Sequence, residues 1–119
     1  IGEIFFTFVD SDGRGKGIDT KFLKMINNIT NIPIICGGGI GKVGHITDIK
    51  KNITDLSGVS LASLLHYNSF KDDFLLNEIN HEKGNFSFFK NNDHFLDFDK
   101  TSIKIIKSKL LNEGIRVRV

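Results

Sequence analysis

The amino-acid sequence predicts an α/β fold built around a parallel β-sheet. Three short, largely apolar stretches have the composition of strands, at residues 3–8, 33–36 and 58–62. They begin about 25 to 30 residues apart, and each is followed by a loop and usually by a helical pattern, which is the alternation of a parallel sheet. The chain has 119 residues, enough for one domain with one modest core.

The first unit pairs a strand with a polar loop. Apolar residues occupy both parities of residues 3–8, so we expect a strand buried on both faces. In the glycine-rich loop 9–17, Asp10 and Asp12 could bind a cation, accept a ligand hydroxyl, serve acid–base chemistry or simply close Asx turns. Asp19 should then cap a helix. The apolar stripe of that helix is formed by Phe22, Leu23, Met25, Ile26 and Ile29.

The second unit contains the most distinctive stretch, residues 33–42. Its strand runs directly into Gly37-Gly38-Gly39, and helical spacing follows from Lys42 to Asn52, so the order is strand, tight loop, helix. Glycines let the backbone approach an anion, and the N–H groups of the next helical turn can point at it. An ordinary βα turn is the alternative. Dinucleotide and P-loop motifs are absent, so neither kind of nucleotide binding is supported.

Two residues near this loop have chemically active side chains. Cys36 is the single cysteine, so it cannot form an internal disulfide, and its place in an apolar strand favours a packing thiol over a nucleophile. His45 lies one position from the apolar stripe of the helix and has no second His or Cys at metal spacing. We therefore expect a solvated histidine, and the sequence predicts neither a metal site nor a cofactor.

The third unit places small residues where the second has glycines. Ala62 and Ser63 follow the strand 58–62, and a backbone and hydroxyl contact to an anion is favoured over a nucleophilic serine because G-x-S-x-G is absent. A short helix is expected from His66. Residues 68–100 break the rhythm and are interpreted as an insertion, whose scattered phenylalanines could form a satellite cluster, a lid or a protein-contact surface. A last helix should begin after Thr101 or Ser102 and stop at Gly114.

The composition of the chain argues against nucleic-acid-binding and membrane-spanning proteins. The net charge is +2, and acids and bases are interspersed, so no basic face for nucleic acid is predicted. No segment has the length and apolarity to span a membrane or the pattern of a secretion signal, and the expected location is cytoplasmic. The chain opens on Ile1-Gly2 rather than Met, which suggests a fragment.

Taken together, the motifs of the chain resemble one enzyme family. They are Gly2-Glu3-Ile4 with Thr7, Asp10-x-Asp12-Gly13, Lys16-Gly17-Ile18-Asp19, Pro33-Ile34-Ile35 with Gly38-Gly39-x-Gly41, Ala62-Ser63-x-x-His66 and Gly114-Ile115-Arg116-Val117-Arg118. In order and spacing they resemble the cyclase subunit of imidazole glycerol phosphate synthase, the HisF type, over residues 1–67 and 101–119. The resemblance implies a (β/α)8 TIM barrel, of which this chain would be the C-terminal portion, strands 6 to 8, with the insertion before the last helix.

The resemblance also implies roles for individual residues. Barrel enzymes place their site at the carboxyl ends of the strands. Phosphate would be bound by Gly38, Gly39, Ala62 and Ser63. Other parts of the substrate would be bound by Thr7, Asp10, Asp12 and Gly13. At the opposite end of the barrel, Glu3 would belong to a ring of charges that gates an ammonia channel.

The activity implied by the resemblance belongs to a longer protein. Such a cyclase takes ammonia from a glutaminase subunit of the HisH type, its heterodimer partner. It converts a phosphoribulosyl formimino aminoimidazole carboxamide ribotide, a phosphorylated small molecule, to imidazole glycerol phosphate and AICAR. The family's two catalytic aspartates stand on the first and fifth strands, so no catalytic residue is assigned here and the chain alone should be inactive.

Departures from the family pattern leave alternatives open. The related isomerase has an aspartate directly after the sixth-strand threonine, where this chain has Phe8. That difference argues against the isomerase. Gly37 and Arg14 also differ from the usual serine and threonine. A HisF-like amidotransferase partner in surface-polysaccharide synthesis is one alternative, and a non-catalytic phosphate- or partner-binding module is another.

Overall fold

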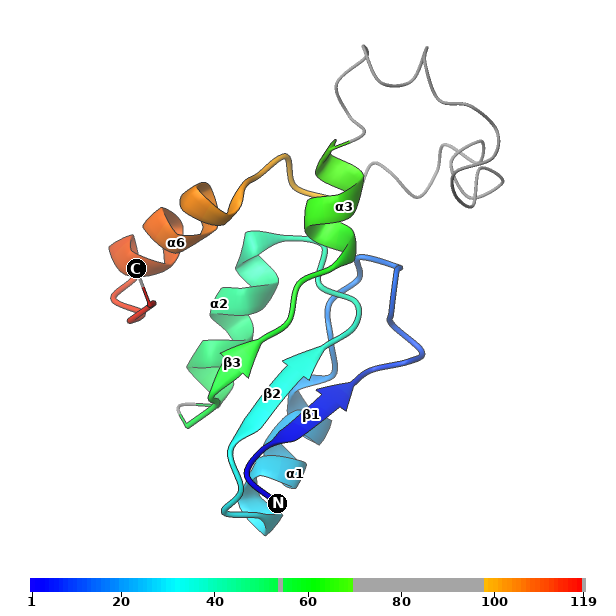
Figure 1. Cartoon of the computed structure of the whole chain (residues 1–119), viewed down its shortest axis with the longest axis vertical. Helices are drawn as coiled ribbons and strands as arrows, with labels where there is room; N and C mark the ends of the chain where they lie inside the picture. Colours follow the sequence, from blue (N-terminus) through cyan, green and yellow to red (C-terminus); the bar gives the residue numbers. More distant parts are fainter. Residues whose placement is uncertain (54, 70–97, 119) are drawn as a thin grey trace.

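The structure is a computed structural model that describes residues 1–53, 55–69 and 98–118. Its elements are, in order, β1 (Ile4–Thr7), α1 (Thr20–Ile29), β2 (Ile34–Gly37), α2 (Val43–Asn52), β3 (Gly58–Val59), α3 (Ser63–Ser69) and α6 (Ile103–Asn112). The strands form one sheet in the order β1-β2-β3, and all three arrows point toward the end where α3 lies (Figure 1). Both strand pairs are parallel. The predicted α/β class with a parallel sheet is confirmed.

The two faces of the sheet are buried unequally. Ile34 and Cys36 point into the core and are 1% and 0% exposed, whereas Phe5 on the other face is 61% exposed. The prediction that residues 3–8 are buried on both faces is therefore wrong for this chain. Strand parity places Phe5 and Thr7 together on the open face, and the helices of the described residues cover only the opposite one.

The first helix begins where it was predicted to begin. Asp19 Oδ1 accepts hydrogen bonds from the N–H groups of Lys21 at 2.9 Å and Phe22 at 3.0 Å, which satisfies two amides of the first turn. Leu23 is fully buried, but Met25 and Ile29 are 54% and 78% exposed. The expected apolar stripe is thus only partly covered within the described chain.

The core lies between the buried face of the sheet and the helices, and side chains from α1, α2, α3 and α6 contribute to it. The fully buried Leu23, Ile34, Ile49 and Leu64 form its centre, and Ile106 and Leu110 of α6 extend it. On α2, Ile46 and Ile49 are both buried, as the helical spacing of this segment predicts. This packing holds the loops at the carboxyl ends of the strands in place.

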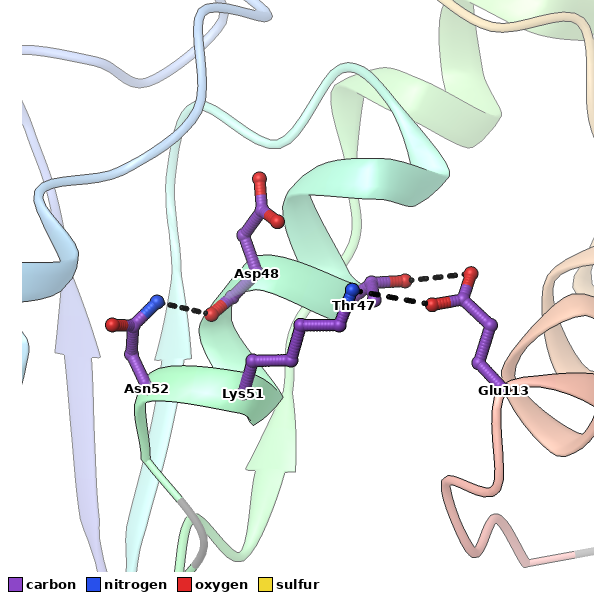
Figure 2. A network of polar contacts seen from close by, with 5 residues as sticks. All are labelled: Thr47, Asp48, Lys51, Asn52 and Glu113. Carbon is purple, nitrogen blue, oxygen red and sulfur yellow. Dashed lines mark hydrogen bonds and ion pairs between the residues drawn. The ribbon is translucent and has the colours of Figure 1, made fainter.

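A polar network joins α6 to α2 (Figure 2). The Thr47 hydroxyl donates to Glu113 Oε1 at 3.3 Å, and Lys51 Nζ lies 3.8 Å from Glu113 Oε2. Asn52 donates from Nδ2 to the carbonyl of Asp48 at 2.7 Å. The Lys51–Glu113 pair is solvent-exposed and contributes little stability, so the apolar contacts below it hold α6 against α2.

The last helix has the predicted ends. Ser102 caps it through a 3.4 Å hydrogen bond from the N–H of Ile105, which selects Ser102 over Thr101. Gly114 adopts a left-handed φ of 75°. The N–H of Ile115 then donates to the carbonyl of Leu110 at 2.9 Å, and that of Gly114 to Leu111 at 3.0 Å. This pattern is a Schellman motif, and it ends the helix.

The third unit differs in its bounds from the prediction. β3 covers only Gly58–Val59, and α3 begins at Ser63 rather than His66. The N–H of His66 donates to the carbonyl of Ala62 at 2.9 Å, so the helix starts immediately after Ala62. Of the predicted insertion 68–100, residues 70–97 and six of its phenylalanines lie outside the described residues, while Phe98 is buried. Among the described residues, no helix has the length and apolarity needed to cross a membrane.

Candidate functional site

A cavity of about 180 Å³ lies at the carboxyl ends of the three strands. Six of the eight residues expected to contact substrate or phosphate line it, and they come from the loops after all three strands. They are Thr7, Asp12, Gly38, Gly39, Ala62 and Ser63. The tertiary structure therefore brings together residues that are separated by up to half the chain.

Three residues with implied roles do not line the cavity. Asp10 is exposed in the turn after β1, and Gly13 contributes its N–H to Asp12 Oδ1 at 3.0 Å. That bond reaches only the next residue rather than the one two positions on, so it is not the bond of an Asx turn. Asp12 itself also borders the cavity. Glu3 precedes β1 at the amino end of the sheet, so it lies at the far end of the strand from Thr7.

Four further residues line the cavity, and none of them has a role implied by the sequence. They are Phe5, Gly37, Ile40 and Ser60. Strand parity could have found two of them, because Phe5 points the same way as Thr7, and Ser60 stands two positions before Ala62. No pattern in the neighbouring sequence indicated that Ile40 would line the cavity.

Close packing against the first loop explains the glycines of the second loop. Gly38 and Gly39 have φ values of 87° and 96°, which side chains rarely allow. A Cβ on Gly38 would lie 2.8 Å from the carbonyl oxygen of Phe8, and one on Gly39 would lie 2.5 Å from that of Gly17. The loop needs glycine for this contact whether or not an anion binds.

Residues from two turns at the cavity have unpaired backbone N–H groups. Within the described part of the chain, the N–H groups of Gly38, Gly39 and Ser63 donate to no acceptor, although all three residues line the cavity. The carbonyl of Gly39 is engaged, since it accepts from the N–H of Gly17 at 2.7 Å. Amides of successive turns that face one concavity are suited to an anion.

The first turn of α2 is not available to an anion, contrary to the expectation from the sequence. The N–H of Val43 donates to Asp99 Oδ2 at 2.8 Å, and the N–H of Gly41 donates to His45 Nδ1 at 3.3 Å. The protein's own carboxylate thus occupies this helix end. His45 is half-buried and engaged, so the prediction of a solvated histidine is also wrong.

An aromatic pair joins α3 to the segment before α6. The rings of Tyr67 and Phe98 meet edge to face with centroids 5.1 Å apart. The pKa of Tyr67 is raised, first by burial and second by the negative charge of Asp12. Asp12 therefore lies within electrostatic reach of Tyr67.

Neither a thiol nucleophile nor a metal cluster is found at this site. Burial raises the pKa of the Cys36 thiol to about 11, so the group stays protonated at neutral pH, as expected of a packing thiol. Among the described residues, no three His, Cys, Asp or Glu side chains stand close enough to hold a metal ion. The polar groups that line the cavity are backbone amides, hydroxyls and one carboxylate, that of Asp12.

Residues 1–71 match the family model described as histidine biosynthesis protein. The chain belongs to the histidine biosynthesis protein family. The match covers β1 through α3, and so includes every residue that lines the cavity. The family resemblance seen in the motifs is thereby confirmed.

Several curated relatives are named imidazole glycerol phosphate synthase subunit HisF. The protein from Methanobrevibacter smithii is 41% identical over 69 residues, which are 58% of this chain and 25% of the relative. The protein from Clostridium botulinum strain Alaska E43 is 39% identical over 118 residues, 99% of this chain and 34% of the relative. The chain spans about a quarter to a third of the length of these curated relatives.

Proposed function

We propose that this chain is the C-terminal part of a HisF-type cyclase subunit of imidazole glycerol phosphate synthase. Its three βα units would be the sixth to eighth of a TIM barrel, and residues 68–100 would be an insertion before the last helix. The observation that carries the proposal is the cavity at the carboxyl ends of the strands, which gathers six of the residues implied by the motifs. The shared name of the relatives supports the same assignment.

Within that protein, this part would bind one phosphate of the substrate. The unpaired N–H groups of Gly38, Gly39 and Ser63 supply donors that need no countercharge. The hydroxyl of Ser63 adds a side-chain donor from a second turn. Thr7 and Asp12, which border the same cavity, would then contact the remainder of the substrate.

The chemical step would need the rest of the longer protein. The described residues supply one carboxylate at the cavity, Asp12, whereas cyclisation with ammonia requires a separate acid and base. In the proposed assignment these are aspartates of the first and fifth strands, and the ammonia comes from a HisH-type glutaminase partner. The chain would therefore position substrate without performing the reaction alone.

A charge placed at Ser63 tests the phosphate site. In the complete protein, Ser63→Asp puts a carboxylate beside the proposed phosphate, and we expect the dissociation constant for inorganic phosphate to rise at least about tenfold. An aspartate at the start of α3 is compatible with the helix dipole, so thermal stability should hold. Calorimetric titration and thermal melting measure the two effects.

Ser102→Asp is the matched control. It makes the same substitution at the start of another helix, α6, at an exposed residue that does not line the cavity. We expect phosphate affinity to stay within about twofold of the wild type, since Ser102 is exposed and does not line the cavity, so water and salt screen its charge. Equal affinity for phosphate in wild type and Ser63→Asp would remove the site.

A further inference from the structure

One row across the open face of the sheet combines two hydroxyls with a glycine. Thr7 of β1 is paired with Gly37 of β2, and Ser60 follows β3 at the next position across the sheet. All three residues line the cavity. The row lies at the last residues of the strands, immediately before the turns that hold the unpaired amides of Gly38 and Ser63.

Ser60 occupies the space that a side chain on Gly37 would need. A Cβ on Gly37 would lie 3.0 Å from Ser60 Cβ, 3.3 Å from the Ser60 carbonyl oxygen and 3.6 Å from its Oγ. The N–H of Ser60 donates to the carbonyl of Cys36 at 2.7 Å, which fixes its backbone against β2. Because Gly37 has no side chain, Ser60 lies close against β2. The part of the cavity over Gly37 is a gap that Ser60 borders on one side and Thr7 on the other.

The hydroxyls on both sides of this gap have unused hydrogen-bonding capacity. Neither the Oγ of Ser60 nor the Oγ1 of Thr7 makes a hydrogen bond to any described residue. Each hydroxyl can donate one hydrogen bond and accept two. A ligand group that both donates and accepts, such as an alcohol, matches a gap between two such side chains.

We propose that Ser60 is a further specificity-determining residue, which binds a hydroxyl on the carbon chain next to the ligand's phosphate. The inference rests on the proposed phosphate site. Phosphate bound at the amides of Gly38 and Ser63 places the adjoining carbons over the row that contains Gly37 and Ser60. Ser60 thus selects polyol phosphates over phosphate itself and over phosphorylated groups without hydroxyls.

Two probes separate this role from phosphate binding. In the complete protein, Ser60→Ala should weaken binding of glycerol 3-phosphate about fivefold, the effect of one lost hydrogen bond, and leave inorganic phosphate within about twofold. Ser60→Cys keeps the shape but is a poor donor, so it should behave as Ser60→Ala does and also tests the proposal if the alanine variant is unstable. Ser57→Ala, at an exposed serine just before β3, should change neither affinity.

The possible results are distinct. Selective loss of glycerol 3-phosphate affinity in both Ser60 variants supports the assignment. Unchanged affinity for both probes, equal loss for both, or wild-type affinity in Ser60→Cys overturns it while the phosphate site stands. A wild-type protein that binds neither probe overturns the proposed function, and the role of Ser60 with it.

Discussion

The carboxylate of Asp99 accepts a 2.8 Å hydrogen bond from the N–H of Val43, 56 positions earlier in the chain. The N–H of Asp99 also donates to the carbonyl of Gly41 at 2.8 Å. Asp99 therefore binds the loop between β2 and α2 through both its backbone N–H and its side-chain carboxylate. The preceding residue, Phe98, is buried and lies against Gly15, where a Cβ would meet its ring at 2.9 Å. The segment before α6 therefore contacts both the first loop, through Phe98, and the loop between β2 and α2, through Asp99.

Removing the Asp99 carboxylate should loosen this loop. We expect Asp99→Ala to lower the free energy of unfolding of the complete protein by about 1 kcal/mol, the usual effect of losing a helix cap. Asp99→Asn keeps an oxygen acceptor and should lose less than half as much. Urea unfolding of the three proteins measures this. If the alanine and asparagine variants are equally destabilised, the hydrogen bond to Val43 is not the source of the effect.

Adding a methyl group to Gly39 should be destabilising. The residue has a φ of 96°, and its Cβ would lie 2.5 Å from the carbonyl oxygen of Gly17, so Gly39→Ala should cost at least about 2 kcal/mol of unfolding free energy. Gly44→Ala is the matched control. It lies in α2 with open space around its Cβ, and should stabilise the protein by about 0.5 kcal/mol. Thermal melting of both variants would contradict this account if their melting temperatures shifted equally.

The contribution of Cys36 to the free energy of unfolding should depend on pH in a defined range. Burial raises the pKa of its thiol from 9.0 to about 11 in the folded state. The protonated thiol's contribution to stability is therefore complete below pH 9 and is lost as the pH rises toward 11. The difference in unfolding free energy between wild type and Cys36→Ala should shrink over this range. A constant difference from pH 8 to pH 11 would contradict the prediction.

Glu3 should affect the supply of ammonia rather than the chemistry. Its place before β1, at the opposite end of the strand from Thr7, separates it from the cavity. In the complete protein together with the proposed glutaminase partner, Glu3→Gln should change glutamine-dependent turnover about fivefold or more and leave turnover with ammonium salts nearly normal. Glu113→Gln, at the C-cap of α6, should alter neither rate. Equal loss in both assays would make Glu3 structural or catalytic.

The isolated chain should associate with itself and should not catalyse cyclisation. β1 and β3 are the outer strands of the described sheet, and Phe5 on its open face is 61% exposed. Unpaired strand edges and exposed apolar side chains recruit partners. Sedimentation at several concentrations and an assay with ammonium salts test both statements. A stable monomer, or turnover above background, would contradict them.

The sequence alone was sufficient for the local features of this fold. Local patterns predict the first two strands, the helices that follow them, the Asp19 cap and the Gly114 stop, because these features depend on side chains within a few residues of each other. The cap of the last helix stayed open between Thr101 and Ser102, and the third unit differed in its bounds. The βα rhythm implied that the strand ends would meet, and the structure places Thr7, Gly38 and Ser63 at one cavity. These features follow from short-range sterics and hydrogen bonding.

Only the tertiary structure decided how those features combine. Whether Phe5 is buried depends on what covers its face of the sheet, and local periodicity holds no information about that cover. Gly38 and Gly39 allow close packing against the first loop, and Asp99 accepts a hydrogen bond at the start of α2. Local sequence did not predict either contact, because each joins segments that are far apart in the chain. The gap beside Ser60 likewise exists only where β2 and β3 lie side by side. Such contacts are set by the packing of whole elements, which a residue's near neighbours in sequence do not determine.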